Sequence, residues 1–138
     1  AGLLDEAAEL ADRVGDGHDP HRTGFGPAAV ESARVAAAVE RGAGPEAVTW
    51  HEQATGRPGW RWLPAEHRAA HLVDAARAYL QVGDLVNAGR SLVDAERTAP
   101  AEIRCRPAVR KLLARVARHP HAPATVTALA ATTGAGRG

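Results

Sequence analysis

Two histidines four residues apart are the first side chains of this sequence that could do chemistry. His67 and His71 would share one face of a helix, with Glu66 beside them. A divalent metal could bridge the two imidazoles, but a stable site needs three or four ligands. The glutamate that an HExxH motif carries between its histidines is also missing here. We therefore interpret the pair as a solvated helix flank and predict no metal site.

A second set of polar residues precedes Pro27. His18 and His21 flank an Asp-Pro pair, which we interpret as an ordinary turn rather than as a metal site. The stretch 24–26 reads Gly-Phe-Gly, and its backbone N–H groups could bind an anion at the start of a helix. Pro27 removes one of those donors, and no strand precedes the stretch. A turn that places Phe25 in a core is the favoured interpretation.

Aromatic residues and the single cysteine add no reaction centre. Trp50, Trp60 and Trp62 are clustered, and such a cluster either lines a ligand cleft or a partner interface, or fills the gap between two helix pairs. We favour packing. Cys105 lies between two arginines, but no base is placed to activate it, and we expect it to be a small core residue. We predict no catalytic residue, no enzyme activity and no cofactor.

Composition and charge restrict the class of protein. Apolar residues make up 45% of the 138 residues but aromatic residues only 4%, so alanine, leucine and valine must form the core. The net charge of +1 provides no overall attraction to nucleic acid or to a membrane. Residues 1–16 are acidic and residues 102–118 are basic. They are either two solvated helix faces, which we favour, or surfaces that attract each other within a dimer or along a stack.

We expect neither a membrane-spanning helix nor a signal peptide. No stretch approaches the 18 apolar residues of a membrane-spanning helix. One cysteine allows no intrachain disulfide, which is typical of a reducing compartment. We expect a cytoplasmic protein without a membrane partner.

Hydrophobic periodicity predicts an all-α chain of about seven helices and no strand. Prolines and glycines mark the ends of the segments, and Asp84 is a predicted N-cap. We predict one domain over residues 1–132 and a disordered tail over 133–138. The expected helices cover residues 3–14, 27–41, 45–55, 64–82, 85–98, 107–119 and 123–132, and residues 100–107 form a short connection.

A spacing of small and large apolar residues recurs in two adjacent predicted helices. It matches the tetratricopeptide (TPR) pattern, in which alanines let two antiparallel helices approach closely. The sequence predicts that Ala76 faces Ala88, and Ala47 occupies the equivalent place one pair earlier. We predict a TPR-like stack of antiparallel helix pairs; the alternative is a generic helical bundle. The matching positions are Leu72, Ala75, Ala76, Tyr79, Ala88, Leu92, Ala95 and Pro100.

The segment 71–107 resembles the C-terminal TPR-like domain of bacterial helix-turn-helix transcription regulators of the xenobiotic-response-element (lambda-repressor-like) class. The resemblance is carried by Asp-Ala-Ala-Arg-Ala-Tyr at 74–79, the Gly83 turn, Ala-Glu-Arg-Thr-Ala-Pro at 95–100 and Arg-Cys-Arg-Pro at 104–107. It extends more weakly over residues 22–118. It implies a regulatory domain for dimerisation, effector sensing or partner binding. DNA binding would belong to an N-terminal domain that this sequence does not contain.

We expect the ligand groove on the concave side of the stack, lined by the first helix of each pair. A structural ion pair, Asp74 or Glu96 with a nearby arginine, is the competing role for charged residues there. The expected partners are a second copy of the chain, in a homodimer, and a peptide or small-molecule effector. Alternatives are a TPR adaptor unrelated to transcription and a small-molecule-binding helical domain. The candidate groove residues are Ser32, Val39, Trp60, Trp62, Val73, Arg77, Leu80 and Gln81.

Overall fold

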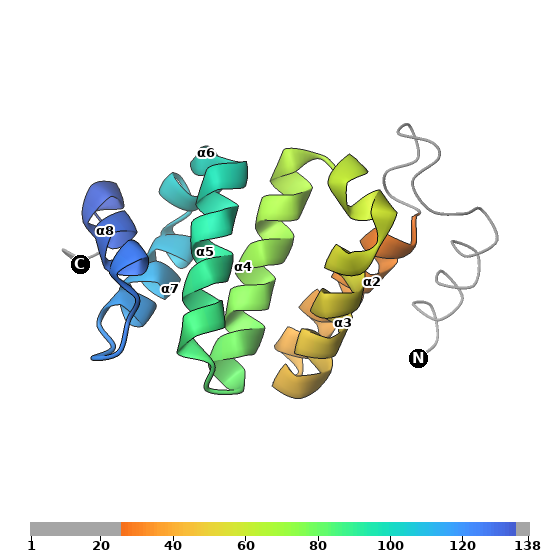
Figure 1. Ribbon diagram of the computed structural model, residues 1–138, viewed down its shortest axis with the longest axis horizontal. Helices are drawn as coiled ribbons and strands as arrows, with labels where there is room; N and C mark the ends of the chain where they lie inside the picture. The colour runs from red at the N-terminus through yellow and green to blue at the C-terminus, as the bar shows by residue number, and fades with distance from the viewer. Residues whose placement is uncertain (1–25, 135–138) are drawn as a thin grey trace.

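The computed structural model describes residues 26–134, which are helical and contain no strand. Within this range there are seven α-helices and one 3-10 helix, η2 (Figure 1). The all-α prediction is therefore confirmed, whereas the helix expected at residues 3–14 lies outside the described residues. The helices are α2 (Pro27–Glu40), α3 (Gly44–Gly56), η2 (Pro58–Trp62), α4 (Ala65–Gln81), α5 (Leu85–Thr98), α6 (Pro100–Arg104), α7 (Pro107–Ala117) and α8 (Ala124–Thr133).

Proline, glycine and one capping aspartate set the ends of these helices. Proline occupies the first turn of α2, α3, α6 and α7, where its missing N–H would have no helical partner. Between α4 and α5 the chain turns at Gly83, whose φ of +79° favours glycine. The Asp84 side chain accepts a hydrogen bond of 3.0 Å from the Asn87 N–H, which confirms the predicted N-cap.

Two expected boundaries differ in the structure. Residues 100–104 form the single-turn helix α6 where we expected only a connection, because one turn is too short to show a hydrophobic period. Cys105 follows α6 and is exposed, so its expected place in the core is wrong. At the C-terminal end α8 includes Thr133, and Gly134 caps it with a φ of +77°. The remaining residues of the expected tail, 135–138, lie outside the described part.

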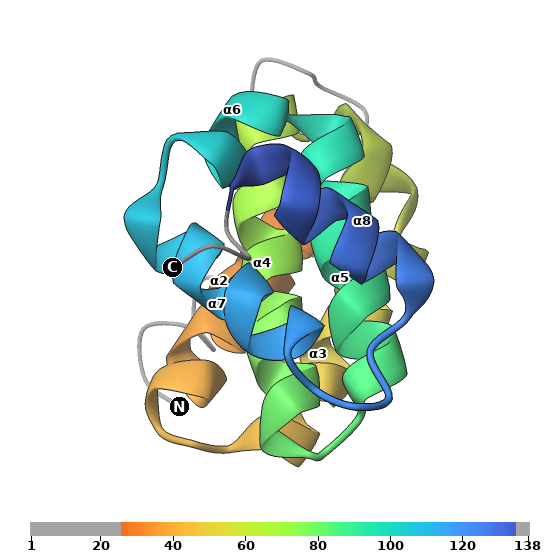
Figure 2. The ribbon, with the colours of Figure 1, turned by 90° about the vertical axis from the view of Figure 1, so that its left-hand side faces the viewer.

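The helices follow one another in chain order from α2 at one end to α8 at the other (Figure 1). The α4–α5 hairpin forms the most extensive helix–helix contact, followed by α2 with α3. Seen from the C-terminal end, α7 and α8 cover the hairpin (Figure 2). Both contact α5, while α4 contacts α2 and α3 on the other side. The α4–α5 hairpin is therefore the centre of the domain.

The core is built largely from small side chains. Between α2, α3 and α4 it consists of Val35 and three fully buried alanines, Ala38, Ala47 and Ala78. A larger cluster joins α4 and α5 to the C-terminal helices through Leu92, Ile103, Leu113 and Val126, among others. Ala76 and Ala88, which were expected at the α4–α5 contact, are both fully buried.

Two glycines mark the closest approaches between helices. A Cβ atom at Gly89 of α5 would lie 2.5 Å from Cγ2 of Val126 on α8. A Cβ atom at Gly44 of α3 would lie 2.8 Å from the Cβ atom of Gln81 on α4. Real Cβ contacts are longer than this, so a side chain at either position must push the two helices apart.

We expect Gly89→Ala to destabilise the domain. Overpacking against the fully buried Val126 costs about 1–3 kcal/mol, and the gain in helix propensity returns up to about 1 kcal/mol. The net loss in the free energy of unfolding, measured by urea denaturation and circular dichroism, should be about 1 kcal/mol.

Gly56→Ala is the matched control, because a Cβ atom there meets open space. It should leave stability unchanged or slightly raised. Adding Val126→Ala to Gly89→Ala should cost less than the sum of the two single changes, since it removes the clash. A Gly89→Ala protein as stable as the wild type would contradict the close approach of α5 and α8.

Candidate functional site

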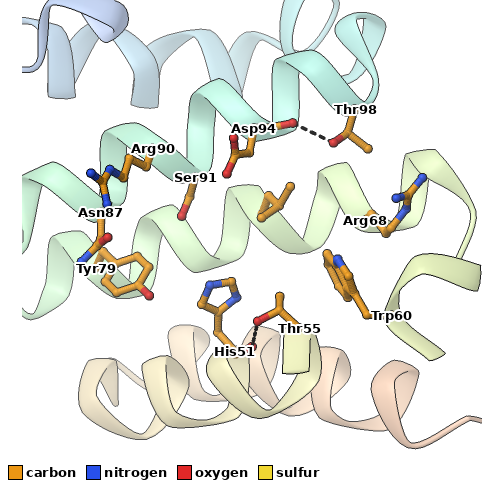
Figure 3. A pocket seen from close by; sticks show the side chains of 11 residues that line it. His51, Thr55, Trp60, Arg68, Tyr79, Asn87, Arg90, Ser91, Asp94 and Thr98 are labelled. Carbon is orange, nitrogen blue, oxygen red and sulfur yellow. Dashed lines mark hydrogen bonds between the residues drawn. The ribbon is translucent and has the colours of Figure 1, made fainter. Parts of the chain in front are cut away.

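A polar cleft of about 410 Å³ lies between α3 and α5, with α4 at its base (Figure 3). Its size falls in the range of small-molecule and cofactor sites. Hydroxyl, amide, imidazole, guanidinium and carboxylate groups line it together with two large aromatic rings and one leucine. The lining residues are His51, Thr55, Trp60, Arg68, Leu72, Tyr79, Asn87, Arg90, Ser91, Asp94 and Thr98.

Helical spacing explains why these side chains gather. On α5 the lining residues are 87, 90, 91, 94 and 98, which fall on one face of a helix at intervals of three and four. On α3 the pair is His51 and Thr55, again four residues apart. With a rise of 1.5 Å per residue, the α5 wall is roughly 16 Å long. The cleft is therefore elongated along the hairpin.

The polar groups are distributed unevenly along this length. Trp60, Arg68 and Thr98 lie at one end, and Tyr79, Asn87 and Arg90 lie at the other (Figure 3). Between them lie His51, Thr55, Ser91 and Asp94. The formal charge of the lining is +1, from two arginines and one aspartate, with the histidine neutral.

A buried chain of hydrogen bonds leads from the interior to this cleft. His51 Nδ1 lies 2.8 Å from His71 Nε2, and His71 Nδ1 lies 2.8 Å from the Ser32 hydroxyl. The chain joins α3, α4 and α2 in that order. Trp60 covers His71 edge-on, with a centroid distance of 4.7 Å, and Tyr79 makes an edge contact with His51 at 5.7 Å. The two aromatic side chains thus fix the orientation of both imidazole rings.

Burial keeps both imidazoles in the neutral form. The pKa of His71 is lowered to about 3, chiefly by burial and additionally by the like charges of the neighbouring His51 and His67. Burial also lowers the pKa of His51, while Glu52 acts in the opposite direction. A neutral imidazole has one N–H donor and one acceptor nitrogen, so each member of the chain can satisfy the next.

The direction of this chain decides what His51 presents. If the Ser32 hydroxyl donates to His71, then His71 donates to His51, and Nε2 of His51 carries a hydrogen. If His71 donates to Ser32, then His51 donates to His71, and Nε2 of His51 becomes an acceptor. Nε2 has no hydrogen-bond partner within residues 26–134, so it is left to the cleft that His51 lines. The positions of the hydrogen atoms on Ser32, His71 and His51 are therefore coupled to the group that meets Nε2 of His51 in the cleft.

Arg68 brings an unsatisfied donor to the wall of the cleft. Its Nε atom is buried and has no hydrogen-bond partner in the described part of the chain. Neither Arg68 nor Arg90 forms an ion pair there, in contrast with the paired Arg77 and Arg104. A buried donor without an acceptor costs about 1–3 kcal/mol. This end of the cleft therefore lacks an acceptor.

The structure does not bring the expected groove residues together on one surface. Trp60 is the only one of them that lines the cleft. Ser32 is buried beside His71, with which it shares a hydrogen bond, and Val73 is buried in the larger core cluster. Trp62 is 50% exposed and lies under the Arg61 guanidinium, 5.3 Å from the ring centroid. Trp50, by contrast, is half-buried beneath Arg34.

The other expected groove residues make structural contacts. Arg77 forms an ion pair of 3.3 Å with Asp74, and Arg104 forms one of 3.0 Å with Glu96, so the competing structural role is confirmed for both acids. The exposed Gln81 side chain donates a hydrogen bond of 3.0 Å to the Val39 carbonyl, linking α4 to α2. Leu80 is half-buried against the larger core cluster.

The expected solvated flank of His67 and His71 is wrong for His71. His67 is exposed, but His71 is only 2% exposed and belongs to the buried chain. The sequence could not reveal this, because the partners of His71 stand 20 and 39 residues away. The polar face of α5 is visible in the sequence as Asn87, Ser91, Asp94 and Thr98 at helical spacing, but the predicted groove lies on the first helix of each pair and does not include it.

Metal ligands, further clefts and membrane-spanning helices are the remaining features of interest. Among residues 26–134, no group of three or more His, Cys, Asp or Glu side chains is placed to hold a metal ion. A second cleft, of about 600 Å³, lies along α7 at the C-terminal end and carries Arg110, Lys111, Arg115 and Arg118. No helix in the described range is long and apolar enough to cross a membrane.

Comparison with known proteins gives no relative. No protein-family model, no curated protein and no solved structure matches this chain. Function must therefore be argued from the cleft and from the sequence pattern.

We expect the stability of the domain to fall below pH 6.5 because of His71. Its pKa is about 6.5 when unfolded and about 3 when folded, so between these values the unfolded chain binds more protons. Stability is fully present above pH 6.5 and is lost as the pH falls toward 3. Between these two pKa values, one such group changes the free energy of unfolding by about 1.4 kcal/mol per pH unit. Urea unfolding at pH 7, 6, 5 and 4 measures this slope.

His71→Gln should be less stable at pH 7, because it disturbs buried hydrogen bonds, but its stability should fall less steeply below pH 6.5. His67→Gln, one turn away and exposed, is the control and should keep the wild-type slope. Equal slopes in the wild type and in His71→Gln would contradict a neutral, buried His71.

Proposed function

We propose that this chain is a non-enzymatic regulatory module that binds an effector in the cleft between α3, α4 and α5. The observation that carries the proposal is the cleft itself: a small-molecule-sized, polar site formed by two successive helix pairs. We further propose that the domain is a TPR-like stack and the sensor domain of a bacterial helix-turn-helix transcription regulator. That part rests on the resemblance over residues 71–107.

The helix arrangement supports the TPR-like part of the proposal. The α2–α3 and α4–α5 pairs each consist of two successive helices in contact, joined by turns at Gly42 and Gly83 with positive φ. Fully buried alanines occupy corresponding places after each turn, Ala47 and Ala88. These are the features by which TPR-like pairs nest.

The position of the cleft supports a sensing role. One wall belongs to the first pair, through α3, and the base and other wall belong to the second pair, through α4 and α5. A ligand that fits only one spacing of the two pairs would favour that spacing. Such differential affinity is what a two-state regulatory domain requires. The change would pass along α2 and α3 to a domain attached before them.

The regulator part of the proposal is tested by the coding region that precedes the codon for Ala1. We expect that reading frame to encode a helix-turn-helix domain, as the resemblance implies. The genomic sequence gives the answer directly. A start codon immediately before Ala1, or an upstream domain of another kind, would contradict the regulator while leaving the cleft to be tested separately.

We also expect the chain to form a homodimer, as is common for regulators of this class. Multi-angle light scattering over a range of concentrations measures the molar mass. A mass twice that of the monomer supports the proposal. A monomer at the highest concentration reached would contradict dimerisation by this domain alone.

A further inference from the structure

Arg68 provides an observation that the packing of the domain does not explain. Its Nε atom is buried but has no acceptor within residues 26–134. Arg68 lines the central cleft, so this buried donor belongs to the cleft wall. Buried polar groups in proteins are nearly always hydrogen-bonded, so an exception in a cleft wall indicates a missing partner.

The chemistry of the missing partner follows from the donor. A guanidinium presents N–H groups in a planar fork that fits the two oxygens of a carboxylate or phosphate. A charged acceptor bonded to a guanidinium also gains more than a neutral one. Thr98 lies at the same end, but its hydroxyl already donates a hydrogen bond of 2.7 Å to the Asp94 carbonyl, so Arg68 is the donor that an anion would meet there.

We propose that the cleft binds an elongated organic anion whose carboxylate or phosphate group is held by Arg68, beside Trp60 and Thr98. This inference rests on the proposed role of the cleft as an effector site and adds the class of the effector. The anionic group lies at the Arg68 end, because the Asp94 carboxylate in the middle of the cleft repels it from there.

The other residues that line the cleft indicate the chemistry of the rest of the ligand. The Asp94 carboxylate would accept a hydrogen bond from a ligand donor such as a hydroxyl or an amine. It forms no ion pair within the described residues. Ser91, Thr55 and Nε2 of His51 can each bind a polar group. A molecule with one terminal acid and several polar groups along about 16 Å satisfies this lining.

The basic cleft along α7 is a weaker candidate for the same chemistry. Its four cations are exposed. Exposed cations bind anions weakly and in a salt-dependent way. It serves as an internal reference in the experiment, because an anion attracted by charge alone would bind there as readily.

The experiment is a titration of the ¹⁵N-labelled 138-residue chain, followed by NMR. The probes are inorganic phosphate and a matched pair, N-acetyltyrosine and N-acetyltyrosinamide, which differ only in the carboxylate. The readouts are the Arg68 Nε–H resonance, identified by its loss in Arg68→Gln, and the backbone amides of Ser91 and Thr98. Residues of α7 report binding at the basic cleft.

We expect phosphate and N-acetyltyrosine to shift the Arg68 and Thr98 resonances, and the amide analogue to bind at least about tenfold more weakly. Arg68→Gln should weaken binding of the two anions by a similar factor, and Arg68→Lys by less, since it keeps the charge. Arg97→Gln, an exposed arginine outside the cleft on the same helix as Thr98, should bind as the wild type does.

Other results overturn the inference in distinguishable ways. If the acid and the amide bind the cleft equally, or Arg68→Gln binds both anions normally, the cleft is a ligand site without an anion position, and the proposed function stands. If the anions shift only α7 resonances, or none, Arg68 holds no anion. Circular dichroism of each variant establishes that it is folded, and Arg68→Lys replaces Arg68→Gln if the latter is not.

Discussion

Close contact between helices through alanine and glycine is the constraint on which this domain depends. Ala38, Ala47 and Ala78 fill the space between α2, α3 and α4, and a Cβ atom at Gly44 or Gly89 would collide with a neighbouring helix. Because the chain has so few aromatic side chains, its packing contacts come from helices that approach one another closely rather than from large side chains. The same proximity brings polar residues of α3, α4 and α5 close enough to line one cleft.

The buried histidines connect this packing to the cleft. His71 stands where α2, α3 and α4 meet, and its two ring nitrogens bond to Ser32 on one side and to His51 on the other. Because burial keeps the imidazoles neutral, the chain stabilises the interior without introducing a buried charge. The same bonds orient His51 toward the cleft. One set of interactions therefore stabilises the interior and also orients a residue that lines the cleft.

The sequence predicted more of the fold than of the site. Prolines, glycines and apolar periodicity located the α-helices from Pro27 to Thr133 except the single-turn α6, and Asp84 was recognisable as a cap because capping depends on local spacing. The site depends on which faces of α3, α4 and α5 meet. Apolar residues extend around much of α4, where the consecutive Leu72 and Val73 are both buried, so the pattern could not show which side lines the cleft. The His71 partnership joins residues far apart in the chain, which no spacing rule reveals.

The order of the helices along the domain has a consequence for how it folds. Its main contacts join helices that are neighbours or near neighbours in the chain, as in α2 with α3 and α4 with α5. Chains dominated by local contacts close short loops first and fold quickly. The α4–α5 hairpin, which contacts helices on both sides, is the natural nucleus from which order spreads outward. Amide hydrogen exchange should accordingly be slowest in that hairpin and fastest toward α2 and α8.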